Sequence, residues 1–341
     1  MQRGTNQRIL RKPWKNKMSQ KRVTPQLGLV CITASKAVRY RTVTRKRLLQ
    51  LSETEQEEVL RNLYTENLQR LNLAIDFCLA NELRLYRIPS NLFPFADTDL
   101  GERVLNELNE ELLEIGERVM SVGIRVVVHP DQFVVLSSDS SEVVANSIKI
   151  LEMHAMIMDK LGLPRSPWAM IEIHGGKSDR AERLVEVIGN LPEGIRSRLA
   201  LENDEYAYSS EEILAVCRQT GVPMVFDAHH HIIHEGLDSY DDPSVAQMQA
   251  AASTTWPVRE WQLVHISNGS EAFRDRHHSD LITVMPSAYC NAPWIEVEAK
   301  LKEEALAKLR EEWLPTLIPP LTSDSMPPFL SKVRSPSPSY K

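Results

Sequence analysis

The chain lacks the features that mark exported, disulfide-bonded and membrane-spanning proteins. It has only 4 cysteines in 341 residues, and they are scattered in or beside apolar stretches, so we expect buried thiols rather than disulfides or a zinc knot. No apolar run approaches the roughly 18 residues that cross a bilayer. No apolar segment follows the basic start, as it would in a signal peptide. These absences predict a non-exported, cytoplasmic protein.

A glycine-rich dinucleotide turn is also missing, so no nucleotide cofactor is expected. The hydrophobic content of 42% is ample for a sizeable core. A chain of this length could form one large α/β domain or two ordinary ones.

Acidic residues are absent from the first 52 positions, which hold fourteen Lys or Arg. The net charge of the whole chain is −6, so the remainder carries about twenty negative charges (−6 minus +14). Eight of the cations lie in an N-terminal arm over residues 1–24. That arm is either a solvated, disordered tail or a binding element for a polyanion such as DNA. The other six follow the first predicted strand: Lys36, Arg39, Arg41, Arg45, Lys46 and Arg47.

Apolar runs alternate with segments of helical spacing along the chain. We expect helices at 56–80, 100–120, 142–161, 181–189, 210–219 and 301–312, with Ser209 or Ser210 as one N-cap and Gly221 just past that helix. Residues 267–293 are expected to form a loop. The expected strands are 27–33, 83–88, 124–129, 169–174, 199–203, 223–228, 262–266 and 294–298.

Eight strands mostly separated by helices favour a (β/α)₈ TIM barrel, an α/β fold, over a doubly wound open sheet. We expect the barrel to occupy residues 25–312. The basic arm over residues 1–24 precedes it. Residues 313–341 are rich in Pro and Ser, which is typical of a flexible tail.

The stretch V-P-M-V-F-D-A-H-H-H, residues 222–231, ends a buried strand in a carboxylate and three imidazoles. If the strand continues, Asp227, His229 and His231 share one face. If the chain turns after Ala228, Asp227 and His230 converge instead. A carboxylate and a neutral imidazole that converge form half of a metal site.

Six consecutive predicted strands end in His, Asp or Glu, and a barrel would direct all of these side chains into one opening, where active sites of this fold lie. Nitrogen and oxygen donors without thiolate suit zinc, manganese or iron, and the many carboxylates favour manganese or magnesium. We therefore predict a multinuclear metal site. His154 is expected to be a packing residue and His234 a loop residue. The strand-end residues are His129, His174, Glu202, Asp227 with His230, His265 and Glu298, with His277 and His278 in the loop after the seventh strand.

Clustered divalent metals and a polyanion partner together predict hydrolysis of a phosphodiester. Beyond this chemistry, the sequence resembles the UV damage endonucleases over about residues 26–312. The resemblance rests on an ordered set of motifs: L-G-L-V-C, Y-R-I-P-S-N-L-F-P, H-P-D-Q-F, L-E-N-D, F-D-A-H-H-H, V-H-I-S, H-H-S-D and E-A-K-L-K-E-E-A.

The resemblance implies a barrel related to endonuclease IV that nicks double-stranded DNA immediately 5′ to a UV photoproduct, leaving a 3′-hydroxyl and a 5′-phosphate. It implies two to three divalent ions, with Mn²⁺ in first place and Zn²⁺ or Mg²⁺ as alternatives. Glu202, Asp227 and His230 are the expected catalytic residues. The implied metal ligands are His129, His174, Glu202, Asp227, His230, His265, His278 and Glu298.

Lesion recognition is implied for Gln132 and Phe133, which match the pair that the family inserts into the helix beside a flipped lesion. DNA contacts are also expected from Arg39, Arg41, Arg45, Lys46 and Arg47. The expected partner is UV-damaged duplex DNA of the nucleoid, and the protein is expected to act as a monomer.

The sequence departs from the family pattern at several positions. The family often has Tyr where Phe133 stands, and a Tyr on its first strand where this chain has Leu29. Some members have a Lys, modified to a metal-bridging carbamate, at the position of Leu263. Some also have a His after the second strand, where Asp97 and Thr98 lie here. These differences leave the third metal position open.

Three other functions remain compatible with the sequence. An abasic-site nuclease of the endonuclease IV type would use the same ligands, and a sugar isomerase or epimerase would use Glu, Asp and His at strand ends without needing a basic arm. A DNA-binding protein without catalysis would explain the arm but not the ligands.

Overall fold

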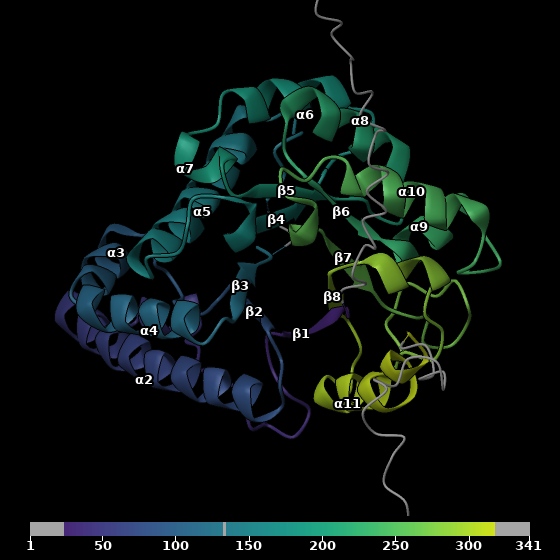
Figure 1. Cartoon of the computed structure of the whole chain (residues 1–341). Coiled ribbons are helices and arrows are strands. Elements are labelled where there is room, and N and C mark those ends of the chain that lie inside the picture. Colours follow the sequence, from purple (N-terminus) through teal and green to yellow (C-terminus); the bar gives the residue numbers. More distant parts are fainter. Residues whose placement is uncertain (1–23, 132–133, 318–341) are drawn as a thin grey trace, which may run out of the picture.

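Residues 24–131 and 134–317 are described by the structure, a computed structural model of the chain (Figure 1). Eight parallel strands close into one barrel, in which each strand pairs with the next and β8 pairs with β1. The predicted (β/α)₈ TIM barrel is confirmed. The strands are β1 (Gln26–Val30), β2 (Leu85–Ile88), β3 (Arg125–Val128), β4 (Ile171–His174), β5 (Leu199–Glu202), β6 (Met224–Asp227), β7 (Leu263–Ile266) and β8 (Trp294–Val297).

The helices surround the barrel as an outer ring (Figure 1). No described helix has the length and apolar character needed to cross a membrane. The helices are α1 (Arg45–Leu48), α2 (Glu53–Ala80), α3 (Asp99–Asn106), α4 (Asn109–Ser121), α5 (Ser141–Lys160), α6 (Ala181–Gly189), α7 (Glu193–Arg196), α8 (Ser210–Thr220), α9 (Ala228–Glu235), α10 (Pro243–Ser253) and α11 (Glu303–Glu312), with 3₁₀ turns at Pro167–Ala169, Arg259–Trp261, Ser287–Asn291 and Leu314–Leu317.

Local sequence signals set several helix ends. Ser209 caps α8 in a capping box with Glu212, and Gly221 ends that helix with a φ of 76°. This left-handed conformation carries little strain in glycine because glycine has no Cβ. Gly221 was predicted, and of the two expected N-cap residues, Ser209 and Ser210, the structure has Ser209.

Several expected boundaries were wrong. The helix predicted over 100–120 is divided into α3 and α4, and the break leaves Leu108 buried. His234 lies in α9 rather than in a loop. Helix α10, which begins at Pro243 after the N-cap Asp242, was not predicted. Among the described residues, the connection from β7 to β8 contains only a 3₁₀ turn, as its loop-like sequence indicated.

The first residues of the predicted tail, 313–317, pack on the barrel domain instead. Trp313 and Leu314 pack against the core, and Leu314–Leu317 forms a 3₁₀ turn. The apolar side chains here explain the extension, because their burial stabilises the end of the domain. The remainder of that tail and most of the basic arm lie outside the described residues.

Inward-facing side chains form layers in the barrel, since alternate residues of a strand face the same side. At the amino end, Arg125 lies over the rings of Trp168, Trp294 and Trp256, at 5.1, 5.4 and 5.6 Å from their centroids. The next layer is an apolar cluster that contains Leu85, Val127, Met170, Ala200, Val225 and Leu263. Charged side chains form the layers above it, toward the carboxyl end of the barrel, which we call the mouth.

Candidate metal centre

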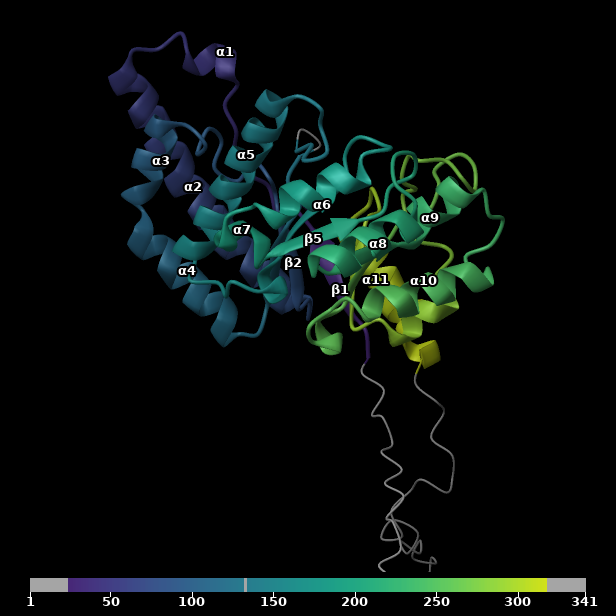
Figure 2. The same cartoon turned by 90° about the horizontal axis from the view of Figure 1, so that it is seen from above.

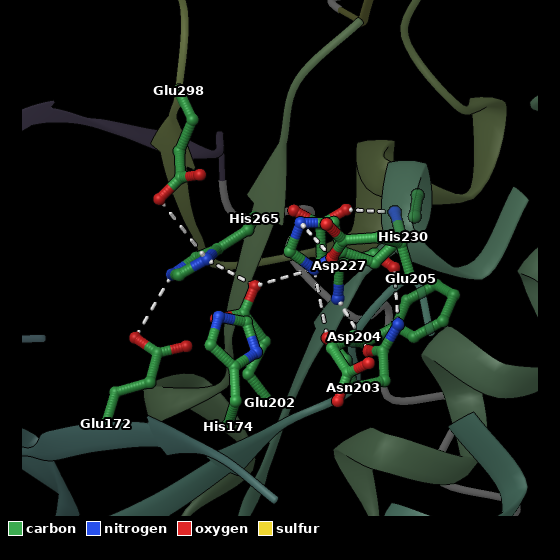
Figure 3. A network of polar contacts seen from close by, with 12 residues as sticks. Glu172, His174, Glu202, Asn203, Asp204, Glu205, Asp227, His230, His265 and Glu298 are labelled. Atoms are coloured by element: carbon green, nitrogen blue, oxygen red, sulfur yellow. Dashed lines mark hydrogen bonds and ion pairs between the residues drawn. The ribbon is translucent and has the colours of Figure 1, made fainter. Parts of the chain in front are cut away.

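Glu202 lies among four imidazoles at the mouth of the barrel. Figure 3 labels three of them, His174, His230 and His265. Its Oε1 is 3.0 Å from Nδ1 of His265 and 3.3 Å from Nδ1 of His230. Its Oε2 is 3.2 Å from Nε2 of His129 and 3.6 Å from Nε2 of His174. The structure therefore brings together five predicted ligands from five consecutive strands or the turns that follow them.

Asp227 ends β6, and the chain turns at once into α9. The Asp227 carboxylate caps this helix by accepting a hydrogen bond of 2.8 Å from the backbone N–H of His230. Of the two arrangements that the sequence allowed, the structure thus has the one in which Asp227 and His230 converge. In addition, Nδ1 of His230 lies 3.0 Å from the carbonyl oxygen of Asn203, which fixes the ring orientation.

The other two histidines of this run, His229 and His231, contact backbone or hydroxyl groups rather than Glu202. Nε2 of His229 lies 2.8 Å from the carbonyl oxygen of Asp275. Nδ1 of His231 lies 2.9 Å from the hydroxyl of Ser210. His154 is buried, as expected of a packing residue.

Glu298 lies directly after β8 and connects the centre to two further side chains. Its Oε1 is 2.6 Å from Nη1 of Arg87 and 3.7 Å from Nδ1 of His265. Its Oε2 is 3.8 Å from Nε2 of His278. His278 is placed by a bridge between its backbone and that of Gly269, so the long β7–β8 loop delivers the last predicted ligand to the mouth.

Three buried charges at this centre were missed by the sequence analysis: Arg87, Glu172 and Glu296. Arg87 pairs with Glu296 inside the barrel. Glu296 and Glu172 lie 2.8 and 3.1 Å from Nε2 of His265. A signal was present, because Glu172 and Glu296 each stand two residues before a predicted strand-end ligand, and residues two apart in a strand face the same side.

The side chains of the centre fit a divalent cation. All donors are imidazole nitrogens or carboxylate oxygens, a set that suits manganese, zinc or iron. Among the described residues, Oδ2 of Asp227 and both carboxylate oxygens of Glu172 are buried without a hydrogen-bond partner. Buried carboxylates are generally paired with a cation or bound to a metal. Four groups have ligand atoms within 4.8 Å of one another: His129 with His174 and Glu202; Glu172 with Glu202 and His265; Glu202 with Asp227 and His230; and Asp227 with His265 and Glu298.

Strong electrostatic coupling accompanies this crowding. Burial opposes ionisation of Glu202, but His265 and His174 outweigh it and hold the Glu202 pKa well below its usual value. Burial lowers the pKa of His265, whereas the charges of Glu172 and Glu202 raise it more, to well above the usual value. Burial raises the pKa of Glu172. The excess of carboxylate that draws a proton to His265 would equally attract a divalent cation.

A cavity of about 580 Å³ opens over the centre. A larger hollow of about 910 Å³ lies beside the β7–β8 loop, but it contains none of the predicted ligands, so we assign the site to the smaller cavity. Its lining includes His129, His174, Glu202, His230, His278 and Glu298.

The predicted DNA-contacting residues differ in whether the structure describes them and in how exposed they are. Gln132 and Phe133 lie outside the described residues. Arg41 pairs with Glu66 at 2.6 Å, and Arg39 is half-buried beside it. The exposed residues Arg45, Lys46 and Arg47 form most of α1, which lies at the edge of the molecule in the β1–α2 connection (Figure 2).

Three positions at which the sequence departs from the family pattern, Leu263, Leu29 and Thr98, have packing or capping roles in the structure. Leu263 is buried in the apolar cluster of the barrel. Leu29 is buried in the core cluster together with residues of the surrounding helices. Thr98 caps α3 and accepts a hydrogen bond of 3.1 Å from the N–H of Gly101. The structure therefore explains these three side chains by packing and capping.

Similar proteins share nearly the whole barrel. A protein of Nostoc sp. named UV DNA damage endonuclease is 61% identical over 297 residues, covering 86% of this chain and 92% of its relative. A protein of Deinococcus radiodurans with the same name is 50% identical over 289 residues, covering 84% and 95%.

Solved structures and a family model extend the comparison. The crystal structure of SacUVDE matches with a TM-score of 0.70 at 27% identity, over 84% of this chain and 98% of that one. Endonuclease IV from Thermus thermophilus matches with a TM-score of 0.53 at 16% identity, over 86% and 98%, which shows a shared fold. The model of the family described as UV-endonuclease UvdE matches residues 25–317. With most of its length matched in this way, the chain belongs to the UV-endonuclease UvdE family.

Proposed function

We propose that this chain is a metal-dependent endodeoxyribonuclease that hydrolyses the DNA backbone immediately 5′ to UV photoproducts and leaves a 3′-hydroxyl and a 5′-phosphate. The observation that carries the proposal is Glu202 with four imidazoles around it, at the mouth of a barrel that belongs to this family. The names of the Nostoc and Deinococcus relatives support the same substrate.

Two to three divalent ions, Mn²⁺ in first place, would occupy this centre. When bound, they would supply activation of water and stabilisation of the charge on the attacking and leaving oxygens. A carboxylate can bridge two cations through its two oxygens, and Glu202 belongs to three of the four possible ligand groups. The proposed ligands are His129, His174, Glu202, Asp227, His230, His265, His278 and Glu298.

The protein frame would position these ligands before DNA binds. Asp227 holds the start of α9 and thereby His230, and Arg87 orients Glu298 from below. Because these side chains project from the ends of barrel strands or from capped turns, little reorganisation is needed during the reaction. Arg276 also lines the cavity, where its guanidinium could bind a backbone phosphate.

The basic helix α1 is proposed to bind DNA phosphates. We predict that changing Arg45, Lys46 and Arg47 together to Gln weakens binding to irradiated and undamaged duplexes about equally, because phosphate contacts position a protein without specifying sequence. The slope of log affinity against log salt should fall by about one for each phosphate interaction that the variant removes. Binding measured by fluorescence anisotropy at several salt concentrations tests this.

A matched control removes the same charge from the opposite end of the barrel. Arg196, Arg218 and Arg259 are exposed and precede strands β5, β6 and β7 on the amino-terminal side. Changing these three to Gln should leave the salt slope almost unaltered. Equal slopes for both triple variants would show that α1 has no special role.

Gln132 and Phe133 are proposed to enter the duplex beside the lesion. Groups that fill the gap left by a flipped base recover part of the opening cost. We therefore expect Gln132→Ala with Phe133→Ala to lower affinity for irradiated DNA by about 1 to 3 kcal/mol for each stacking interaction removed, with less effect on undamaged DNA. Phe133→Tyr should be nearly neutral, since it retains the ring. A double variant that keeps its full preference for damage would exclude this role.

The decisive experiment separates the proposed function from its alternatives. The protein is incubated with Mn²⁺ and with irradiated, abasic or undamaged duplexes, and the nicks are mapped at nucleotide resolution. Cleavage 5′ to photoproducts supports the proposal, and cleavage confined to abasic sites indicates an endonuclease IV type of activity. No cleavage of any duplex would leave the sugar isomerase or epimerase function to be tested.

A further inference from the structure

Glu172 is a buried acid that the proposed ligand set does not include. It lies on β4, two residues before His174, and its side chain is 0% exposed. Neither of its carboxylate oxygens has a hydrogen-bond partner among the described residues. One of them is 3.1 Å from Nε2 of His265, at the distance of a hydrogen bond but without its direction. The acid points into the centre (Figure 3).

Glu296 is at a comparable depth but has a different environment. Its Oε2 pairs with Arg87, which donates to it from both Nε, at 2.8 Å, and Nη2. The guanidinium therefore compensates Glu296 inside the barrel. Glu172 has no guanidinium partner among the described residues. Its one nearby basic group is His265, which it shares with Glu202 and Glu296, and a buried carboxylate that is only partly compensated costs stability.

The excess of acids over permanent positive charge at this centre also favours a cation next to Glu172. One guanidinium, that of Arg87, lies among the acids of this centre. Among the described residues, Arg87 is the one Arg or Lys that forms an ion pair with these acids, so the five carboxylates exceed the permanent positive charge beside them. The surplus of negative charge favours a divalent cation among them. These acids are Glu172, Glu202, Asp227, Glu296 and Glu298.

We infer that Glu172 is a metal ligand, which with Glu202 and His265 holds one divalent cation inside the barrel, below the ions at the mouth. The ligand atoms of these three buried side chains lie within 4.8 Å of one another. This inference rests on the proposed metal-dependent function and adds a ligand to it. Two carboxylates and one imidazole favour manganese, whereas the outer group of His129, His174 and Glu202 is richer in imidazole and favours zinc more.

The test uses the full chain with Glu172 changed to Gln, which keeps the shape and removes the charge. Metal-free wild type and variant are loaded with Mn²⁺, and the bound ions are counted by native mass spectrometry and elemental analysis. Thermal unfolding is recorded before and after loading. We expect the variant to bind one Mn²⁺ fewer per chain and to gain less melting temperature on loading, because fewer ions stabilise the folded state.

The metal-free proteins distinguish a ligand from a structural acid. A ligand without its cation is an uncompensated charge, so Glu172→Gln should leave the melting temperature of the metal-free protein unchanged or raise it. A structural acid would show the reverse: a lower melting temperature and an unaltered Mn²⁺ count. That second result would overturn the inference.

Matched variants complete the design. Glu296→Gln has the same chemistry and similar depth, but it removes the partner of Arg87, so it should lower the melting temperature of the metal-free protein and keep the Mn²⁺ count. Glu172→Leu removes the polar group altogether and should lose the same ion as Glu172→Gln, which covers the case in which the amide fails to fold. A full Mn²⁺ count in Glu172→Leu would contradict the inference.

The outcome for wild type separates this inference from the proposed function. Wild type that binds no Mn²⁺ and no other divalent ion would overturn both. Wild type that binds Mn²⁺ and nicks damaged DNA, alongside Glu172 variants with the same Mn²⁺ count, would overturn the inference alone and leave the proposed function standing.

Discussion

Glu202→Gln is expected to reduce nicking of irradiated duplex by about 10³-fold or more, which corresponds to about 4 kcal/mol of lost transition-state stabilisation. The carboxylate contacts His129, His174, His230 and His265. An amide of the same shape keeps one oxygen but loses the negative charge and one of the two donor atoms. The possible ligand groups that share Glu202 would each lose negative charge or a donor oxygen, so at least one ion should be displaced. Initial rates on irradiated duplex, measured with excess enzyme, give the size of the loss.

Two variants serve as comparisons. His230→Ala removes one imidazole of the same group and should give a loss of similar order. Glu205→Gln is the matched control, because Glu205 lies in the loop directly after β5 and lines the same cavity. It lies 3.8 Å from Nε2 of His230 but belongs to none of the possible ligand groups among the described residues. It should retain most activity. A folded Glu202→Gln protein with the wild-type rate would refute the site assignment.

The barrel and its strand-end residues could be predicted because both depend on local order along the chain. Alternating apolar runs and helical segments indicate βα units, and parallel strands direct their carboxyl ends to one opening. The structure accordingly has Asp227, His265 and Glu298 together at that opening, whereas their function stays a prediction. The convergence of Asp227 with His230 depended on where the chain turns, and the sequence left two alternatives open.

The buried charges beneath the mouth could not be assigned in the same way. The spacing of Glu172 and Glu296, each two residues before a predicted strand-end ligand, indicated that both face the barrel interior. Their partners could not be predicted, because only the closed barrel brings them next to Arg87 and His265. The pairing of Arg87 with Glu296 joins β2 to β8 across the barrel, a contact between residues 209 positions apart. Such contacts have no local signature in the sequence.

The side chains inside the barrel change from cationic and aromatic at the amino end, through apolar, to acidic and imidazole-rich at the mouth. Arg125 and the surrounding tryptophans fill the amino end, and the apolar cluster with Leu263 lies above them. This packing excludes water beneath the charged layer, which strengthens the electrostatic interactions between Glu202 and its imidazoles. Leu263 belongs to that packing, which accounts for an apolar residue two positions before His265 of the candidate metal centre.

Removal of divalent ions should abolish activity and also destabilise the fold. Treatment with a chelator, followed by its removal, is expected to lower nicking by about 10³-fold or more, and added Mn²⁺ should restore it. The unfolding temperature should fall with the ions, because the buried acids Glu172 and Asp227 then lie close to other carboxylates without a divalent counterion.

The size of the stability change can be estimated from mass action. An ion present at a hundred times its dissociation constant stabilises the folded state by about 2.7 kcal/mol per site, so two or three sites should give a melting-temperature shift of several degrees or more.

Calorimetry with and without Mn²⁺ measures this shift, and Glu202→Gln should show a much smaller one because its ligand groups are broken. Chelated wild type that nicks at the original rate would contradict metal dependence. Equal Mn²⁺ shifts in wild type and Glu202→Gln would show that the stabilising ions bind elsewhere. Loss of nicking without any change in unfolding temperature would mean that the ions are bound too weakly to offset the charges of the interior.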